Sequence, residues 1–190
     1  MSGRTWGPEG PPPEAYSRIT NPERFAPLHA FAEGLLANLA LEHDVEREEG
    51  YDLEPTLESS EMARSSIKIS PRSQSAASLQ VSFTKFPGLV VQAGRWCRER
   101  FPACGCDACD ETVESTIEEL RFLVRNVTVG QFIEEVTLPP LVGSAWLSTE
   151  IGSRALGRWT AHRTRIRRAE AGSMLRAGRR RYDWEAWPTR

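Results

Sequence analysis

The sequence predicts an α+β fold in which antiparallel β-hairpins pack with about three helices. Two observations lead to this prediction. Segments with the three- and four-residue apolar spacing of helices are separated by segments in which apolar and polar residues alternate. The strand-like segments come in neighbouring pairs joined by turn residues, and no β-α-β alternation is visible. This arrangement favours antiparallel sheets over a parallel one.

A chain of 190 residues is long enough for one domain with a substantial core. Residues 1–15 consist largely of Pro and Gly, which predicts a disordered arm in which Trp6 is available to dock on the body or on a partner. We expect residues 16–190 to form a single α+β domain that ends in an Arg-rich helix and tail.

The first predicted helix begins near Asn21, which is a suitable N-cap residue followed by proline, and Pro27 either kinks this start or delays it by a turn. An apolar stripe from Leu28 to Leu39 indicates the buried face, and Gly50 is a suitable end. The acidic residues 51–65 lack a clear period and predict a loop.

The second predicted helix is capped by Asp110 or Thr112 and ends near Asn126. Acidic side chains in its first turn and arginines in its last turn complement the helix dipole. A third helix is expected over about 154–171, capped by Ser153, with its arginines facing outward.

The strand predictions are based on alternation of apolar and polar residues. Residues 78–96 predict a β-hairpin around a Pro-Gly turn, and they lead into the cysteine-rich stretch. Residues 130–138 and 143–151 predict a second pair of neighbouring strands, separated by two prolines. Residues 179–188 alternate aromatic and charged side chains, which indicates a last strand or an extended tail.

Charge is distributed unevenly along the chain. Residues 1–150 carry 13 basic and 23 acidic side chains, a net charge of −10, whereas residues 151–190 carry 11 arginines and three acids, a net charge of +8. A basic segment lying on an acidic body explains this asymmetry better than a nucleic-acid or membrane contact. The sequence has no targeting signal and no apolar run that spans a bilayer, so we expect a cytoplasmic protein with reduced thiols.

The most specific chemical feature is the stretch FPACGCDACDE at residues 101–111. It contains Cys104, Cys106 and Cys109, and Cys97 lies seven residues before the first of them. Four thiolates are the right number for tetrahedral zinc, which is therefore the candidate metal. Cys97 is set apart from the other three, so its participation is the weakest part of this hypothesis.

Oxygen ligands and two alternatives without metal also fit this stretch. Asp107 or Asp110 offers an oxygen ligand in place of Cys97. A redox role is the first alternative, because Cys109 lies just before a helix N-terminus that favours thiolate, although the neighbouring acids oppose it. A tight turn with small, partly buried thiols is the second alternative.

The stretch FPACGCDACDE also resembles the signature of an uncharacterised bacterial family, a domain of unknown function. Weaker similarity extends to FPGL at 86–89 and to GQFIEEV at 130–136, so the resemblance covers most of the chain. It implies no activity. It implies only which residues belong to the family motif, and Cys97 has no place in it; the motif residues are Cys104, Cys106, Asp107, Cys109 and Asp110.

These observations favour an accessory or interaction domain over an enzyme. The sequence contains no P-loop, dinucleotide-binding, nucleophile-elbow or zinc-protease motif, and Glu134 and Glu135 face opposite sides of a predicted strand. One alternative is a nucleic-acid-binding protein that uses the Arg-rich C-terminal segment, with Trp159 and Tyr182 interleaved. Another is a thiol-based redox protein. A protein partner fits this sequence, nucleic acid is less favoured, and no membrane partner is expected.

Overall fold

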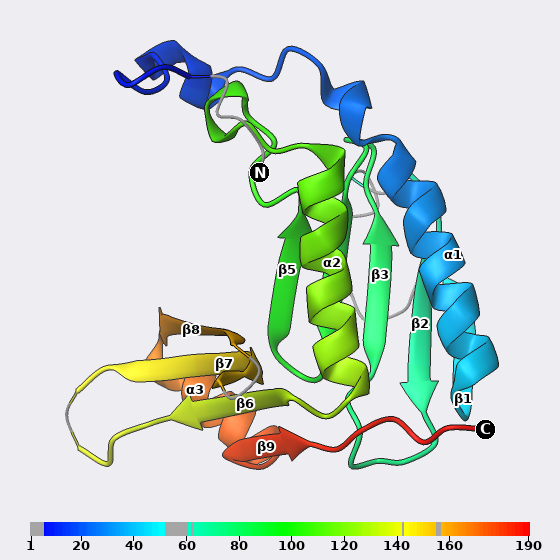
Figure 1. The fold of residues 1–190 in the computed structure, drawn as a ribbon. Coiled ribbons are helices and arrows are strands. Elements are labelled where there is room, and N and C mark those ends of the chain that lie inside the picture. The colour runs from blue at the N-terminus through cyan, green and yellow to red at the C-terminus, as the bar shows by residue number, and fades with distance from the viewer. Residues whose placement is uncertain (1–5, 52–60, 62, 142, 155–156) are drawn as a thin grey trace.

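The computed structural model describes residues 6–51, 61, 63–141, 143–154 and 157–190. Within these residues the chain forms two antiparallel sheets and three α-helices (Figure 1), which confirms the predicted α+β fold. The strands are ordered β1-β2-β3-β4-β5 in the first sheet and β8-β7-β6-β9 in the second. Among the described residues, none of the helices combines the length and hydrophobicity that crossing a membrane requires.

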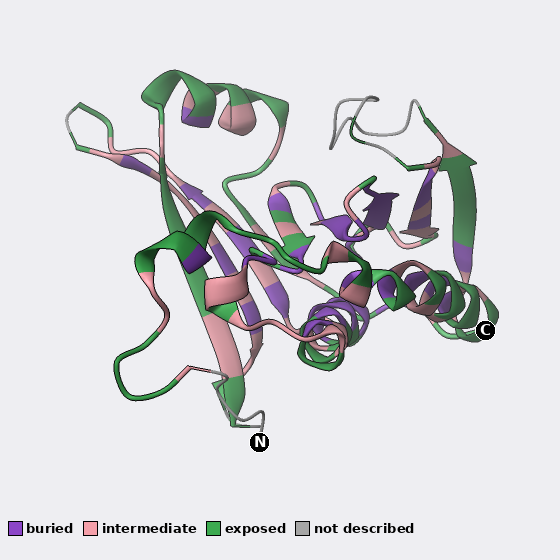
Figure 2. Cartoon of the chain, turned by 90° about the horizontal axis from the view of Figure 1, so that it is seen from above, coloured by how far each residue is buried: buried purple, intermediate pink, exposed green. Residues whose placement is uncertain are grey.

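The first sheet and its two helices form the larger body. Its elements are β1 (Val45–Gly50), β2 (Ser66–Pro71), β3 (Leu79–Phe83), β4 (Leu89–Ala93), β5 (Cys97–Phe101), α1 (Pro27–Glu42) and α2 (Val113–Thr128). Helices α1 and α2 lie side by side across one face of the sheet (Figure 1). Seen from above, buried residues gather where the helices meet the sheet (Figure 2).

The second sheet packs beside the first and carries the third helix. Its elements are β6 (Phe132–Thr137), β7 (Ala145–Ser153), β8 (Arg158–Ile166), β9 (Arg181–Trp184) and α3 (Arg168–Ala177). Helix α3 packs on β6 and β7 through a small apolar cluster that includes Val136, Ala145 and Ala171. The tail after β9 runs beneath the first body (Figure 1), where the indole N–H of Trp187 donates to the carbonyl of Ala77 at 2.8 Å.

Several predicted elements are confirmed. The hairpin at 78–96 contains β3 and β4. Residues 130–138 contain β6, and the strand predicted at 143–151 is its antiparallel partner β7, which continues to Ser153. Thr112 caps α2: its hydroxyl accepts the N–H of Ser115 at 3.2 Å, and the Ser115 hydroxyl accepts the N–H of Thr112 at 3.1 Å. Of the two alternatives for residues 179–188, the strand is observed as β9, which pairs with β6.

The first helix begins about a turn after Asn21, which is the delay that Pro27 offered as an alternative, and its predicted C-terminal end is too late. Asn21 makes no side-chain capping bond, and Pro22–Phe25 form a 3-10 helix (η2) before α1 starts at Pro27. Helix α1 ends at Glu42 instead of near Gly50, because residues 45–50 pair with β2 as β1. Pairing with a neighbouring strand outweighs the helical preference of the Glu- and Arg-rich segment. Most of the acidic loop expected at 51–65 lies outside the described residues.

The prediction of a third helix over 154–171 was wrong. Residues 158–166 form β8, which pairs with β7 along its whole length, and α3 begins only at Arg168. Trp159, Ile166 and the threonines between them are strand-forming residue types, and they outweigh the thin helical stripe. Helix α2 also continues past Asn126 to Thr128.

Candidate metal site in the cysteine loop

Residues 102–112, which we call the cysteine loop, connect β5 to α2. The Glu111 carboxylate accepts three successive backbone N–H groups of this loop, from Ala103 at 2.9 Å, Cys104 at 3.0 Å and Gly105 at 2.7 Å. These bonds curl the backbone around the carboxylate. The hydrogen bonds to Glu111 therefore fix the backbone at Cys104 without a bound metal.

Gly105 is required by the shape of this loop. Its φ of +77° lies in the left-handed region, and an added Cβ would lie 2.9 Å from Cζ of Phe86. Its carbonyl accepts a hydrogen bond from Nη2 of Arg24 at 3.0 Å. The small residue between Cys104 and Cys106 thus allows the two thiols to turn toward the same side.

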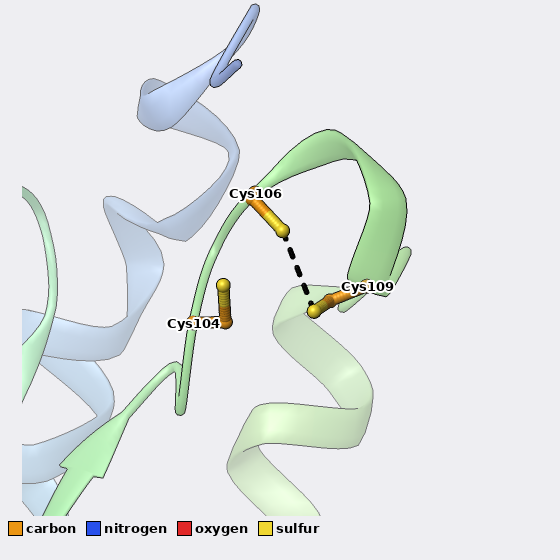
Figure 3. Close-up of side chains that lie close together, drawn as sticks. All are labelled: Cys104, Cys106 and Cys109. Atoms are coloured by element: carbon orange, nitrogen blue, oxygen red, sulfur yellow. Dashed lines mark hydrogen bonds between the residues drawn. The ribbon is translucent and has the colours of Figure 1, made fainter. Parts of the chain in front are cut away.

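The loop brings three sulfurs together (Figure 3). The Sγ atoms of Cys104, Cys106 and Cys109 all lie within 4.8 Å of one another, and those of Cys106 and Cys109 are 3.4 Å apart. Thiolates bound to one tetrahedral zinc at about 2.3 Å are roughly 3.8 Å apart. The 3.4 Å separation is somewhat shorter than this value and the other two lie within 4.8 Å, so small side-chain movements bring the three sulfurs to the spacing of a zinc–thiolate cluster.

The three thiols do not have equal proton affinities. Hydrogen bonds from Cys104 and then Cys109 lower the pKa of Cys106, and hydrogen bonding to Cys106 raises the pKa of Cys109 to about 12. Cys106 is buried, whereas Cys104 and Cys109 are exposed. Of the Cys106 and Cys109 thiols, that of Cys106 therefore loses its proton more readily, whereas the redox interpretation favoured Cys109.

The two aspartates predicted as oxygen ligands lie next to the sulfurs but outside the cluster. Asp107 Oδ1 accepts the N–H and hydroxyl of Thr20, each at 3.0 Å, and Oδ2 accepts Nε of Arg18 at 2.8 Å. These partners, Thr20 first and then Arg18, lower the pKa of the Asp107 carboxyl. Asp110 follows the 3-10 helix η4 (Asp107–Cys109) with a φ of +51°. Among the described residues, the group with metal-ligand spacing consists of the three cysteines alone.

Cys97 lies at the far end of β5 from the cysteine loop. It starts the strand, is 3% exposed, and packs in the core of the first body. Burial is the main cause that raises the pKa of its thiol well above the ordinary value. A five-residue strand separates it from the loop by roughly 13 Å of extended chain. The structure therefore does not bring Cys97 to the other three cysteines.

The N-terminal segment is the part of this site that sequence reasoning missed. The indole N–H of Trp6 donates to the carbonyl of Asp107 at 3.2 Å, and the N–H of Asp107 donates to the carbonyl of Arg18 at 2.8 Å. Trp6 thus docks on the body, which is one of the two alternatives predicted for it. Residues 1–5 of the expected arm lie outside the described residues, and η1 (Pro13–Ser17) follows in the described part.

Comparison with known proteins places the whole of this architecture in one family. The model of the "Family of unknown function (DUF6226)" matches residues 3–190. No curated protein and no solved structure matches the chain. The match covers the cysteine loop, both sheets and all three α-helices, and it agrees with the resemblance deduced from the loop motif. The chain therefore belongs to DUF6226, a family of unknown function.

Proposed function

We propose that this protein is an accessory or interaction domain in which Cys104, Cys106 and Cys109 bind one zinc ion. The observation that carries the proposal is the convergence of three Sγ atoms within 4.8 Å in a loop whose backbone is held by Glu111. Thiolates select zinc among the divalent ions that favour tetrahedral geometry. The ion neutralises the charge that results when all three thiols lose their protons.

The location of the loop supports a structural role for the ion. The cysteine loop joins β5 to α2 and is bound by the N-terminal segment through Arg18 and Thr20. An ion held here fixes the shape of the loop that meets all three parts. The sulfurs lie on a short loop and η4, so the free energy of metal binding contributes directly to the order of that loop.

The coordination number supports a role in interaction. A structural zinc site normally has four protein ligands, whereas the described residues supply three at this position. The nearby carboxylates of Asp107 and Glu111 are already engaged with Arg18, Thr20 and the loop backbone. The fourth position is then available to water or to a side chain of a partner protein, and two of the three cysteines are exposed.

Metal analysis of the protein purified without chelator tests this proposal. We expect about one equivalent of zinc, which Cys106→Ala removes and Cys97→Ala retains, because Cys97 lies outside the cluster. Less than about a tenth of an equivalent, with all thiols titratable in the folded protein, contradicts zinc binding. Rapid alkylation of one cysteine in a metal-free protein supports the thiol-redox alternative instead.

A second candidate function uses the face of the second sheet that points away from α3. We call this the outer face, and the strand register assigns to it Trp146, Trp159, Arg163 and Arg165. The guanidinium of Arg163 lies 4.6 Å from the ring centre of Trp146. Arginines and aromatic rings on an open sheet face are typical of surfaces that stack single-stranded nucleic acid.

Internal ion pairs reduce the charge available for this function. Arg158 pairs with Glu119 at 2.7 Å, and Arg181 pairs with Glu135 at 3.2 Å, so part of the basic segment is neutralised by the body. In the described part of the chain, no ion pair engages Arg163 or Arg165. Binding of a single-stranded oligonucleotide that weakens steeply with salt, and is lost in the Arg163→Glu, Arg165→Glu double variant, supports this function. Absence of binding at low salt contradicts it.

A further inference from the structure

A cavity of about 270 Å³ lies where the two sheets meet beside α2, and no cysteine lines it. We call it the junction pocket. Its apolar wall is formed by Phe101 of β5, Phe122 and Leu123 of α2, and Ile151 of β7. Polar side chains complete the lining, with Glu99 on β5 and His162 on β8. A mostly apolar cavity with a few polar groups is the usual form of a small-molecule site.

Strand alternation explains why these side chains share the pocket. Glu99 is two residues from Phe101 on β5, so both point to the same face of the first sheet. His162 is paired with Thr149, and Thr160 is paired with Ile151, so both belong to the inner face of the second sheet. Each sheet thus contributes one titratable side chain next to an apolar neighbour.

Glu99 differs from the other two carboxylates that line the pocket. Glu111 is satisfied by the cysteine loop, and Glu119 is paired with Arg158 at 2.7 Å. For Glu99, no hydrogen bond or ion pair engages the carboxylate in the portion of the chain described by the structure. Burial raises the pKa of Glu99, and the nearby His162 partly offsets this effect.

We propose that the junction pocket binds a small organic amine, with the ammonium group on Glu99 and an apolar body against Phe101, Leu123 and Ile151. With Glu119 paired to Arg158, the carboxylates of Glu99 and Glu111 remain against the guanidinium of Arg100, and this balance favours a cation over an anion. The volume suits a single ring with a short substituent. The proposal does not require zinc, because no cysteine lines the pocket, although Ala103 and Glu111 of the cysteine loop form part of its wall.

Benzylamine is a suitable probe, with benzyl alcohol and benzoate as ligands of the same shape but different charge. We expect benzylamine to bind with a Kd in the millimolar range or better, since only about eight non-hydrogen atoms contribute. Amide shifts in a ¹H–¹⁵N correlation spectrum should concentrate at β5, α2 and β8. Benzyl alcohol should bind at least about tenfold more weakly, because it lacks the charged donor, and benzoate should bind more weakly still.

Variants of one carboxylate decide the proposal. Glu99→Gln should weaken benzylamine binding at least about tenfold, whereas Glu99→Asp should keep the preference for amine over alcohol. Glu48→Gln, which removes an exposed charge on β1, is the matched control and should leave the affinity unchanged. Equal affinity for amine and alcohol, unchanged affinity in Glu99→Gln, or no shifts at the pocket would each overturn the proposal.

Discussion

Two glutamates each collect the N–H groups of a turn, but in very different surroundings. Glu111 accepts three backbone N–H groups in the cysteine loop, where it is only partly buried. Glu134 accepts the backbone N–H groups of Arg95, Trp96 and Cys97, at 2.9, 2.7 and 2.6 Å, and the indole N–H of Trp184 at 2.9 Å, and is 0% exposed. The same arrangement of hydrogen bonds thus serves an exposed loop and a buried junction.

Burial gives the two carboxylates different roles. Glu134 lies on β6 and binds the turn between β4 and β5, so it joins the second sheet to the first. Burial raises the pKa of its carboxyl, and its N–H donors oppose that increase. Hydrogen bonds are stronger in such a low-dielectric environment, and unpaired polar groups there are more costly. We infer that Glu134 holds the two sheets together, whereas Glu111 shapes a loop that remains accessible to a ligand.

The largest expected effect comes from Gly94→Ala in the turn that Glu134 binds. Gly94 has a φ of +59°, and an added Cβ would contact Oε2 of Glu134 and lie 2.9 Å from Cε1 of Phe132. We expect the free energy of unfolding to fall by about 4 kcal/mol, from backbone strain plus displacement of a buried carboxylate. Chemical denaturation measures this loss.

Gly105→Ala is the matched control in the other turn. It adds a similar backbone strain at a φ of +77°, but its nearest neighbour is the ring of Phe86, which is only partly buried. We expect a loss of about 1–2 kcal/mol. Equal losses at the two glycines would contradict the view that burial separates the two turns.

The next largest effect is expected for Glu134→Gln. An amide has one oxygen acceptor, and its NH₂ group faces N–H donors, so about two of the four donors lose their partner. We expect a loss of about 3 kcal/mol in the free energy of unfolding, measured by denaturation in urea. Glu135→Gln on the opposite side of β6 removes only partly exposed ion pairs to Arg180 and Arg181 and should cost less than about 1 kcal/mol. Similar losses of unfolding free energy for the two variants would refute the inference that Glu134 holds the two sheets together.

Local sequence patterns predicted the elements whose packing agrees with their own propensity. The charged first and last turns of α2, its Thr112 cap and the strands β3 and β4 all appear as expected. The pattern was misleading where pairing partners decide the structure. Residues 45–50 are charged and helix-compatible, yet they pair with β2, and the thin stripe at 158–166 belongs to β8. Such long-range pairing is not encoded in the local period.

The sequence predicted the part of the candidate site in which the candidate ligands are close together in the chain. Spacing alone identified Cys104, Cys106 and Cys109, because a loop of six residues brings its own side chains together. Spacing did not identify Glu111 as the residue that shapes the loop, since its hydrogen bonds go to backbone N–H groups, which have no side-chain signature. The contribution of Arg18 depends on contacts across almost ninety residues.

Glu111→Gln tests the contribution of the carboxylate in the cysteine loop, which is the more exposed of the two turns. The amide keeps one acceptor oxygen, so some of the three loop bonds remain, and water reaches the loop to satisfy the others. We expect a loss of about 1 kcal/mol in the free energy of unfolding. If zinc binds as proposed, the affinity for zinc should also fall about 10- to 100-fold, because a residue that orients the ligands is removed.

Two readouts separate these effects. Denaturation of metal-free protein measures the loss of loop bonds, and competition with a chelator measures the affinity for zinc. Glu114→Gln, an exposed acid in the first turn of α2, is the control and should change the zinc affinity little. If Glu111→Gln lowered the free energy of unfolding as much as Glu134→Gln does, solvent exposure would not weaken the hydrogen bonds between a carboxylate and the backbone of a turn.

The smallest effect is expected for Asp107→Asn, which acts on the order of the N-terminal segment alone. The substitution removes the ion pair with Arg18 but keeps one oxygen that accepts from Thr20. We expect faster tryptic cleavage after Arg18, followed by mass spectrometry, with the Tm of the domain unchanged within about 2 °C. Asp44→Asn, which removes an exposed ion pair to Arg72 elsewhere, should leave this cleavage rate unchanged. A lower Tm without faster cleavage would show that Asp107 stabilises the whole fold, as Glu134 does, instead of only the segment that covers the cysteine loop.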